Sequence, residues 1–129
     1  MKHIIVTTPK SEMKNAELEA KECIDNGSGY YFRKMSRQPK DIVIGESRIY
    51  YVEDGYIRGY ATIIGFSQEE NLECETTGKT WANKDGGFLW MPACTWKWIA
   101  PIPMKGFQGW RYFDDSDIEI VGGWLDPKP

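Results

Sequence analysis

The chain has 129 residues, and its formal net charge is −3, from 16 Lys and Arg against 19 Asp and Glu. An acidic chain with an isoelectric point near 5.2 is not expected to coat nucleic acid by overall positive charge, so any binding of that kind must be local. This length supports one hydrophobic core rather than two, and we expect a single domain over residues 1–129.

Cysteine and histidine usage argues against metal and disulfide chemistry. The three cysteines, Cys23, Cys74 and Cys94, are far apart and form no CxxC pair, and His3 is the only histidine. We therefore expect no zinc site, no disulfide framework and no cofactor. The first residues form no long apolar run of the signal-peptide or membrane type, which predicts a cytoplasmic protein without a membrane partner.

The first part of the chain predicts a strand, a helix and a second strand. Residues 3–8 are rich in β-branched side chains, as in a strand. Ser11 can cap a helix, and Asn26-Gly27 can end it. Between these points, apolar residues recur at helical spacing: Met13, Ala16, Ala20 and Ile24. Residues 30–35 read as the second strand, and a basic loop that contains Pro39 follows.

The strongest local signal is a hairpin in the middle of the chain. Residues 49–53 and 56–66 are rich in β-forming side chains and are joined by Asp54-Gly55. Both residues of this pair tolerate positive φ, which the tight turn of a hairpin requires. Gly45-Glu46 predicts a turn just before the first strand.

The remainder of the chain predicts further strands around one irregular segment. The polar stretch 67–87 is expected to be a loop or irregular insertion, and residues 88–91, 95–99 and 118–124 are strand candidates. Pro92, Pro101 and Pro103 should lie at bends or sheet edges. A strand, a helix and then a run of strands predict an α+β fold, a small mixed β-barrel with one main helix packed near its open side.

Aromatic and basic residues gather in the segment 95–113, which is also rich in Gly and Pro. Over residues 79–111 five Lys and Arg stand against one Asp, and over residues 30–48 five stand against two acidic residues. Aromatic faces can stack bases while cations meet phosphates, so this composition favours a nucleotide or nucleic-acid ligand. Two alternatives remain open: the rings can fill a β-barrel core, and the charges can be ordinary solvated surface.

The central hairpin carries two short motifs, a hydrophobic-Gly-Asp/Glu motif and a Gly-x-Ala-x-Ile motif, and residues 101–109 read Pro-Ile-Pro-Met-Lys-Gly-Phe-Gln-Gly. The motif residues are Ile44, Gly45, Glu46, Gly59, Ala61 and Ile63. These features resemble the PUA-like superfamily, which includes ASCH and EVE domains and whose central hairpin is marked by the same two motifs. The resemblance spans most of the chain except residues 67–87, and its motifs mark a fold rather than a ligand.

The resemblance implies binding of nucleic acid, with RNA favoured over DNA, or of a modified nucleotide, without catalysis. Members of the superfamily commonly bind RNA or DNA, and several hold one base in a cleft between barrel and helix. Transferred by location, this cleft would be formed by Thr8, Lys10, Ser11, Tyr31, Arg33, Lys34, Trp96, Trp98, Gln108, Trp110 and Arg111. Thr8 and Ser11 could instead only cap the helix, and Trp96 and Trp98 share a strand face and could be core.

Two other functions remain as alternatives. Some small ASCH proteins resemble amidohydrolases that act on modified nucleosides through a Gly-x-Lys-x-x-Thr type motif. At the corresponding junction this chain reads Gly27-Ser-Gly-Tyr-Tyr-Phe32, so glycine replaces the lysine and no threonine follows. The second alternative is a protein-interaction module that uses the aromatic surface as a hot spot. Asp114 and Asp115 lie in a turn-like sequence, which predicts solvated surface carboxylates.

Overall fold

The computed structural model describes residues 1–7, 30–35, 37, 39–67, 71–73, 80–82 and 87–123. Within these residues the chain forms strands and one 3₁₀ helix, η1 (Ala93–Thr95). The strands are β1 (His3–Thr7), β2 (Tyr30–Lys34), β3 (Arg48–Glu53), β4 (Tyr56–Thr62), β5 (Gly65–Ser67), β6 (Asn71–Glu73), β7 (Thr80–Ala82), β8 (Phe88–Pro92), β9 (Lys97–Pro103), β10 (Trp110–Phe113) and β11 (Ile120–Gly123).

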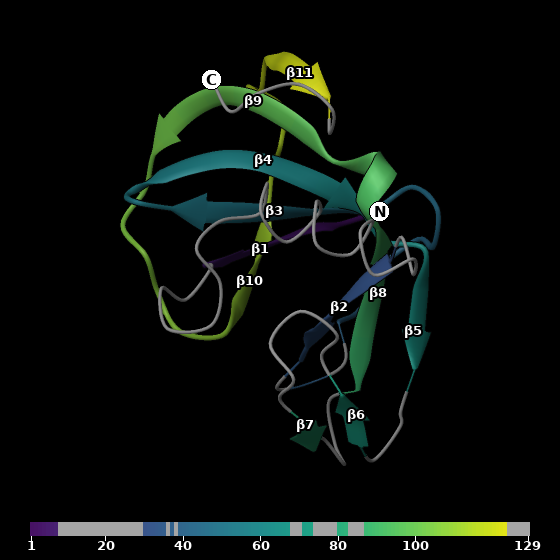
Figure 1. Cartoon of the computed structure of the whole chain (residues 1–129). Coiled ribbons are helices and arrows are strands. Elements are labelled where there is room, and N and C mark those ends of the chain that lie inside the picture. Colours follow the sequence, from purple (N-terminus) through teal and green to yellow (C-terminus); the bar gives the residue numbers. More distant parts are fainter. Residues whose placement is uncertain are drawn as a thin grey trace.

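Three sheets organise these strands. Sheet A has the order β10-β1-β3-β4-β9-β11, sheet B the order β2-β8-β5, and β6 pairs with β7 in a separate two-stranded sheet. Within sheet A, β1 and β3 are parallel and the other neighbours are antiparallel. Figure 1 shows sheet A as a strongly curved layer, with sheet B set against one end of it and β6 and β7 beyond sheet B.

The predicted α+β barrel with one main helix is wrong. In the part of the chain that the structure describes, no α-helix occurs, and the outermost strands of sheet A, β10 and β11, do not pair with each other. The predicted helix over residues 11–25 lies outside the described residues. Hairpin and turn motifs determine how neighbouring strands pair locally, but closure of a barrel depends on the stagger and tilt of all strands together, which no short motif encodes.

The central hairpin is confirmed. Strands β3 and β4 pair from Arg48↔Thr62 to Glu53↔Tyr56, and the turn residues Asp54 and Gly55 have φ of 52° and 83°. The second strand of the predicted hairpin, residues 56–66, is divided into two strands in the structure. It leaves sheet A after β4 and continues as β5 in sheet B, so one stretch of sequence joins the two sheets.

Three other elements differ from the prediction. Strand β10 was not expected, and the segment 67–87 contains β5's last residue and the β6–β7 pair rather than loop alone. Strand β9 runs through Pro101 to Pro103. The residue pairs between β9 and β11 end at Ile99, so the prolines lie where β9 pairs with β4 alone and the missing N–H groups cost little.

Hydrophobic residues cover both faces of sheet A. One face packs with sheet B around Ile4, Val6, Tyr51, Trp96 and Trp98, together with Met35, Ile49, Ala61, Ile63, Leu89, Met91 and Trp110. The opposite face is built on Ile5, Tyr50, Val52, Ile57, Tyr60 and Ile99, with side chains from residues 102–118 packed against it. A strand covered on both faces does not need to alternate between apolar and polar residues, and the four residues 49–52 of β3 form such a buried hydrophobic run.

Candidate nucleic-acid interface

Strand β10 forms one edge of sheet A and carries the exposed Arg111 and Tyr112, together with the buried Trp110. In the described residues its one strand partner is β1, with Val6↔Trp110 and Ile4↔Tyr112 in register. Alternation places Trp110 and Tyr112 on the sheet face that holds Ile4, and Arg111 on the other. Both faces of this strand border the same open edge.

Two cations lie over two aromatic rings at this edge. The guanidinium of Arg37 is 4.3 Å from the ring centroid of Trp110, and the ammonium of Lys2 is 4.3 Å from that of Tyr112. The two rings meet edge to face, with centroids 5.1 Å apart. The backbone N–H of Lys40 donates to the Tyr112 hydroxyl at 2.8 Å. We call Lys2, Arg37, Lys40, Trp110, Arg111 and Tyr112 the basic edge.

The charge of the basic edge is positive, although the chain as a whole is negative. Lys2, Arg37, Lys40 and Arg111 are exposed, and the exposed Asp41 lies beside them, since its backbone carbonyl accepts from the Lys2 N–H. Arg111 also lies over the ring of Phe107, with 4.2 Å from guanidinium carbon to centroid. Guanidinium groups stacked on rings keep their N–H donors directed outward in the ring plane, where an anion can reach them.

The inner end of the basic edge contains a buried donor without an acceptor. Trp110 is 6% exposed, and its indole Nε1 has no hydrogen-bond partner in the described structure. Thr7, which follows the Val6 partner of Trp110, accepts two hydrogen bonds. Arg33 Nη1 donates to the Thr7 carbonyl at 3.5 Å, and the Phe107 N–H donates to Thr7 Oγ1 at 3.0 Å. A buried N–H without an acceptor costs about 1–3 kcal/mol, so a ligand acceptor that reached this indole would recover that cost.

The structure separates the predicted cleft residues into four groups. Arg33, Trp110 and Arg111 lie at or near the basic edge, and Gln108 is exposed just before β10. Trp96 and Trp98 are each 1% exposed and pack edge to face in the core, so their rings are closed to a ligand in solution. Thr8, Lys10 and Ser11 lie outside the described residues. Tyr31 and Lys34 belong to β2, and only their backbone is described.

Sequence reasoning missed Lys2, Arg37, Lys40 and Tyr112 as members of this surface. The positive charge of residues 30–48 was visible in the sequence, but nothing local connected it to β10. Pairing of β1 with β10 and the contact of residue 40 with Tyr112 bring the separate segments together. Lys2 carries no sequence signal of its own, because its contact depends on the strand register.

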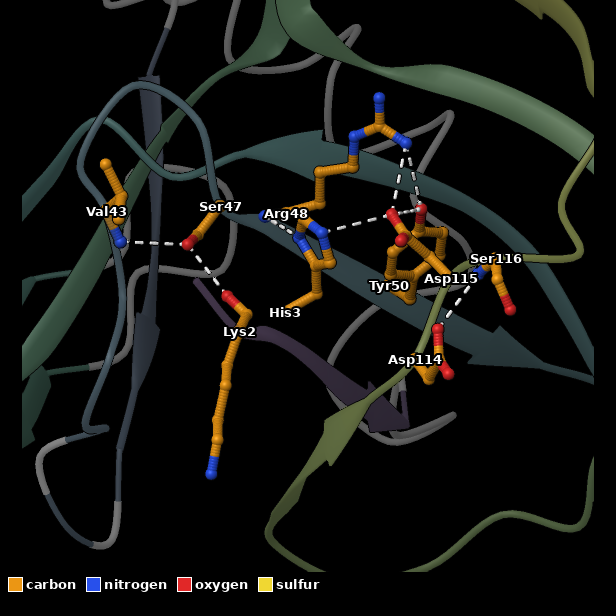
Figure 2. Close-up of polar contacts among 9 residues, drawn as sticks. All are labelled: Lys2, His3, Val43, Ser47, Arg48, Tyr50, Asp114, Asp115 and Ser116. Carbon is orange, nitrogen blue, oxygen red and sulfur yellow. Dashed lines mark hydrogen bonds and ion pairs between the residues drawn. The ribbon is translucent and has the colours of Figure 1, made fainter.

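A second polar cluster lies at the opposite end of β10 and joins His3, Arg48, Tyr50 and Asp115 (Figure 2). Asp115 Oδ2 accepts from the Tyr50 hydroxyl at 2.8 Å and from Arg48 Nη1 at 3.2 Å, and His3 Nε2 is also 3.2 Å away. The backbone N–H of Arg48 donates to His3 Nδ1 at 2.9 Å. Asp115 is thus a bonded residue at the sheet rather than the solvated surface carboxylate that the sequence predicted.

The pKa values of this cluster follow from its burial. Burial lowers the pKa of His3 from its ordinary 6.5, with Arg48 and the N-terminal amine adding to the effect and Asp115 and Asp114 opposing it. Burial also raises the pKa of the Tyr50 hydroxyl, so it remains a donor to Asp115. Nδ1 of His3 already accepts a hydrogen bond, and Nε2 lies beside a carboxylate oxygen, so the Nδ1 lone pair is not available to a substrate as a general base.

A small apolar hollow is lined in part by the segment 39–44, which also carries Lys40 of the basic edge. Its volume is about 160 Å³, and its lining is Pro39, Ile42, Ile44, Phe66 and Leu89. Val43, Ile44 and Ile64 are exposed aliphatic side chains around it. A hollow of this size and lining fits one ring-sized or branched aliphatic group.

Comparison with protein-family models, with curated proteins and with solved structures finds no match for this chain. In the described part of the chain, no helix has the length and apolar character needed to cross a bilayer. The same residues contain no cluster of three or more His, Cys, Asp or Glu side chains placed to hold a metal ion.

Proposed function

We propose that this protein binds single-stranded nucleic acid, RNA in preference to DNA, along the basic edge. The observation that carries the proposal is the pair of adjacent cation–aromatic stacks, Arg37 on Trp110 and Lys2 on Tyr112, on an open sheet edge. Lys40 adds a third cation beside Tyr112, and Arg111 adds a fourth from the opposite face of the same edge strand. Four cations on one edge of an otherwise acidic chain give a local phosphate-binding surface.

The stacks determine how bases would be held. Arg37 already lies over Trp110, so a base would stack on the outer face of the guanidinium or on Tyr112, which is 37% exposed, rather than on the indole. Guanidinium planes and tyrosine rings both stack unpaired bases, and each such contact contributes roughly 1–3 kcal/mol. The cations would hold phosphates without reading the sequence, so we expect modest sequence preference.

Three single substitutions test this proposal. Arg37→Ala and Arg111→Ala each remove an exposed cation from the basic edge, whereas Lys97→Ala removes an exposed cation from β9, at the other side of sheet A. Fluorescence anisotropy with labelled oligouridine and with the matching DNA would report affinity. We expect the first two variants to lose about fivefold in affinity, or ~1 kcal/mol each, and Lys97→Ala to bind as the unmodified protein does.

The proposal would be overturned if the unmodified protein bound neither oligonucleotide, or if Lys97→Ala lost as much affinity as the other two. Trp110→Ala is a poor test of binding, because that indole is 6% exposed and belongs to the core cluster. Removing it would cost about 3–5 kcal/mol of folding stability and would confuse loss of contact with loss of structure. Exposed cations avoid this difficulty.

The apolar hollow favours a second candidate function, docking of a protein partner. The described residues of its lining offer no hydrogen-bonding side chain, so an aliphatic or aromatic side chain suits it better than the polar edges of a base. Capture experiments before and after nuclease treatment separate the two candidates. Nuclease would release partners held through nucleic acid, and partners held at the hollow would remain.

A further inference from the structure

The bonds of His3 determine its protonation state and tautomer. Nδ1 accepts a hydrogen bond from the Arg48 backbone N–H at 2.9 Å, so that nitrogen carries a lone pair and no proton. Nε2 lies 3.2 Å from Asp115 Oδ2, a carboxylate oxygen that can only accept. One form of the ring satisfies both contacts, the neutral imidazole with its proton on Nε2.

We propose that His3 is a proton-controlled clasp between β1, the start of β3 and the turn after β10, closed when the imidazole is neutral and opened when Nδ1 takes a proton. His3 belongs to β1, Arg48 begins β3, and Asp115 follows β10 by two residues. Figure 2 shows the imidazole between the other two groups. The clasp therefore joins three segments that are far apart in the sequence.

Protonation breaks a specific hydrogen bond. A proton from solvent adds to the Nδ1 lone pair, and the new N–H then faces the Arg48 N–H, so two donors meet and neither has an acceptor. Loss of such a buried bond disfavours the closed arrangement. The Nε2–H to Asp115 contact survives protonation and becomes charge-assisted, so the ring is expected to move away from Arg48 while it remains near the carboxylate.

The charged groups around the imidazole have opposing effects on the pKa of His3. Asp115 and Asp114 favour the imidazolium, whereas Arg48 and the N-terminal amine disfavour it, and burial disfavours it most. Tyr50 and Tyr60 flank Arg48: Tyr50 accepts from Arg48 Nη1 at 3.2 Å, and the ring of Tyr60 lies under the guanidinium at 4.3 Å. Arg48 is therefore held beside the imidazole and remains a fixed opposing charge.

Opening is expected to stay local, because the bonds next to His3 do not titrate. The Lys2 N–H donates to the Asp41 carbonyl at 2.9 Å, and the Ser47 hydroxyl donates to the Lys2 carbonyl at 2.8 Å while accepting from the Val43 N–H. Arg48 and Tyr50 also continue to hold Asp115. The clasp thus loosens one contact of β1 with β3 and leaves the neighbouring loop attached.

The effect of pH on stability has a definite sign. The folded-state pKa of His3 lies below the unfolded value of 6.5, so as pH falls through 6.5 the unfolded chain takes up the proton first. The contribution of the clasp to stability is complete above pH 6.5 and decreases as pH falls toward the folded pKa. Below the folded pKa this particular loss no longer grows.

Nuclear magnetic resonance tests the clasp directly, because His3 is the only histidine of the chain. Long-range ¹H–¹⁵N spectra of the imidazole would identify the tautomer, and a scalar coupling across the hydrogen bond would connect Arg48 N with His3 Nδ1. We expect the Nε2–H tautomer at neutral pH and a titration midpoint below 6.5. In the same transition the coupling should vanish and exchange of the Arg48 amide should accelerate.

Matched variants show whether the proton acts through His3. His3→Asn keeps a carbonyl acceptor near the position of Nδ1 and cannot titrate, so protection of the Arg48 amide should no longer change in that pH range. Asp115→Asn should lower the His3 midpoint further than Asp114→Asn, because Asp115 makes the larger favourable contribution. If a variant does not fold, the tautomer, the titration midpoint and the Arg48 amide exchange of the unmodified protein still test the clasp. An Nδ1–H tautomer, a midpoint at or above 6.5, or an Arg48 amide unaffected by the titration would refute the clasp.

Discussion

Gly59 on β4 is a position where the fold leaves no room for a side chain. A Cβ added there would lie 2.5 Å from Trp96 Cζ2 and closer still to the carbonyl oxygen of Lys97 on the paired strand β9. The indole of Trp96 therefore packs directly on the backbone of β4. The sequence marked this glycine as part of a motif, but the reason for glycine is visible only in the packing.

Substitution of Gly59 by alanine should destabilise the fold by about 1–3 kcal/mol, because neither the backbone oxygen nor the buried indole can move away easily. Gly65→Ala is a matched control: its nearest neighbour would be Trp90 Cβ at 3.6 Å, an ordinary contact. Denaturant midpoints would compare the two, with Gly65→Ala within about 0.5 kcal/mol of the unmodified protein. Equal stability of both variants would contradict this packing of Trp96.

The tryptophans show how one residue type divides between core and surface. Trp96 and Trp98 were candidates for ligand stacking or for core, and their burial assigns them to the core. Trp110 lies at the border, buried by its neighbours yet covered by an exposed arginine. Composition alone cannot make this distinction, because the same ring serves either role and the difference lies in what the rest of the chain places over it.

At the scale of elements, the β3–β4 hairpin is where sequence and structure agree best. Its turn needs positive φ at two adjacent residues, and Asp54-Gly55 supplies residue types that tolerate it. This is a local requirement, so a local pattern predicts it. The pairing register also follows, except at the bulge between Tyr51 and Val52.

Gly55→Val should therefore destabilise the hairpin, by about 1–2 kcal/mol, because a β-branched residue resists the left-handed conformation that Gly55 adopts at φ 83°. Apart from Gly55 and its two chain neighbours, no heavy atom of the described residues lies within 4 Å of the position that a Cβ would occupy, so the effect is conformational and not steric crowding. Gly55→Asn is the control, since Asn adopts this conformation readily. Thermal unfolding in parallel would distinguish them, and an equal loss for both would argue against the turn geometry.

The limits of a strand were harder to predict where the chain passes from one sheet to another or pairs with a distant strand. The apolar run 56–66 gave no sign that the chain leaves sheet A after Thr62 and enters sheet B at Gly65. Strand β10 escaped prediction because its four residues follow a glycine-rich loop and only alternate partially between buried and exposed. Both features depend on the distant strands β8 and β1, which supply the hydrogen bonds.

For the whole molecule, charge distribution matters more than net charge. The chain carries −3 overall, yet Lys2, Arg37, Lys40 and Arg111 share one edge. A binding surface of this kind attracts an anionic strand locally, while the rest of the molecule repels it. Binding that depends on the proposed edge should therefore be weak at high salt.

The salt dependence gives a quantitative prediction. Four phosphate contacts to single-stranded nucleic acid correspond to a slope of about −3 in a plot of log affinity against log salt concentration, since each contact contributes roughly −0.7. Arg111→Ala should reduce the magnitude of that slope by about 0.7, and Lys97→Ala should leave it unchanged. Titrations at several salt concentrations would measure it. A slope near zero would show that phosphates do not meet this surface.

The sequence by itself determined features that depend on a few adjacent residues: the hairpin turn at Asp54-Gly55, the positions of several strands and the basic character of residues 30–48. Only the tertiary structure decided that sheet A stays open in the described residues, which indoles are buried, and that Lys2, Arg37 and Lys40 meet at the edge strand β10. It also joined His3 to Asp115 across the whole chain. Local conformation follows from the side chains at hand, whereas burial and strand neighbours depend on contacts between residues tens of positions apart, and no short pattern specifies those contacts.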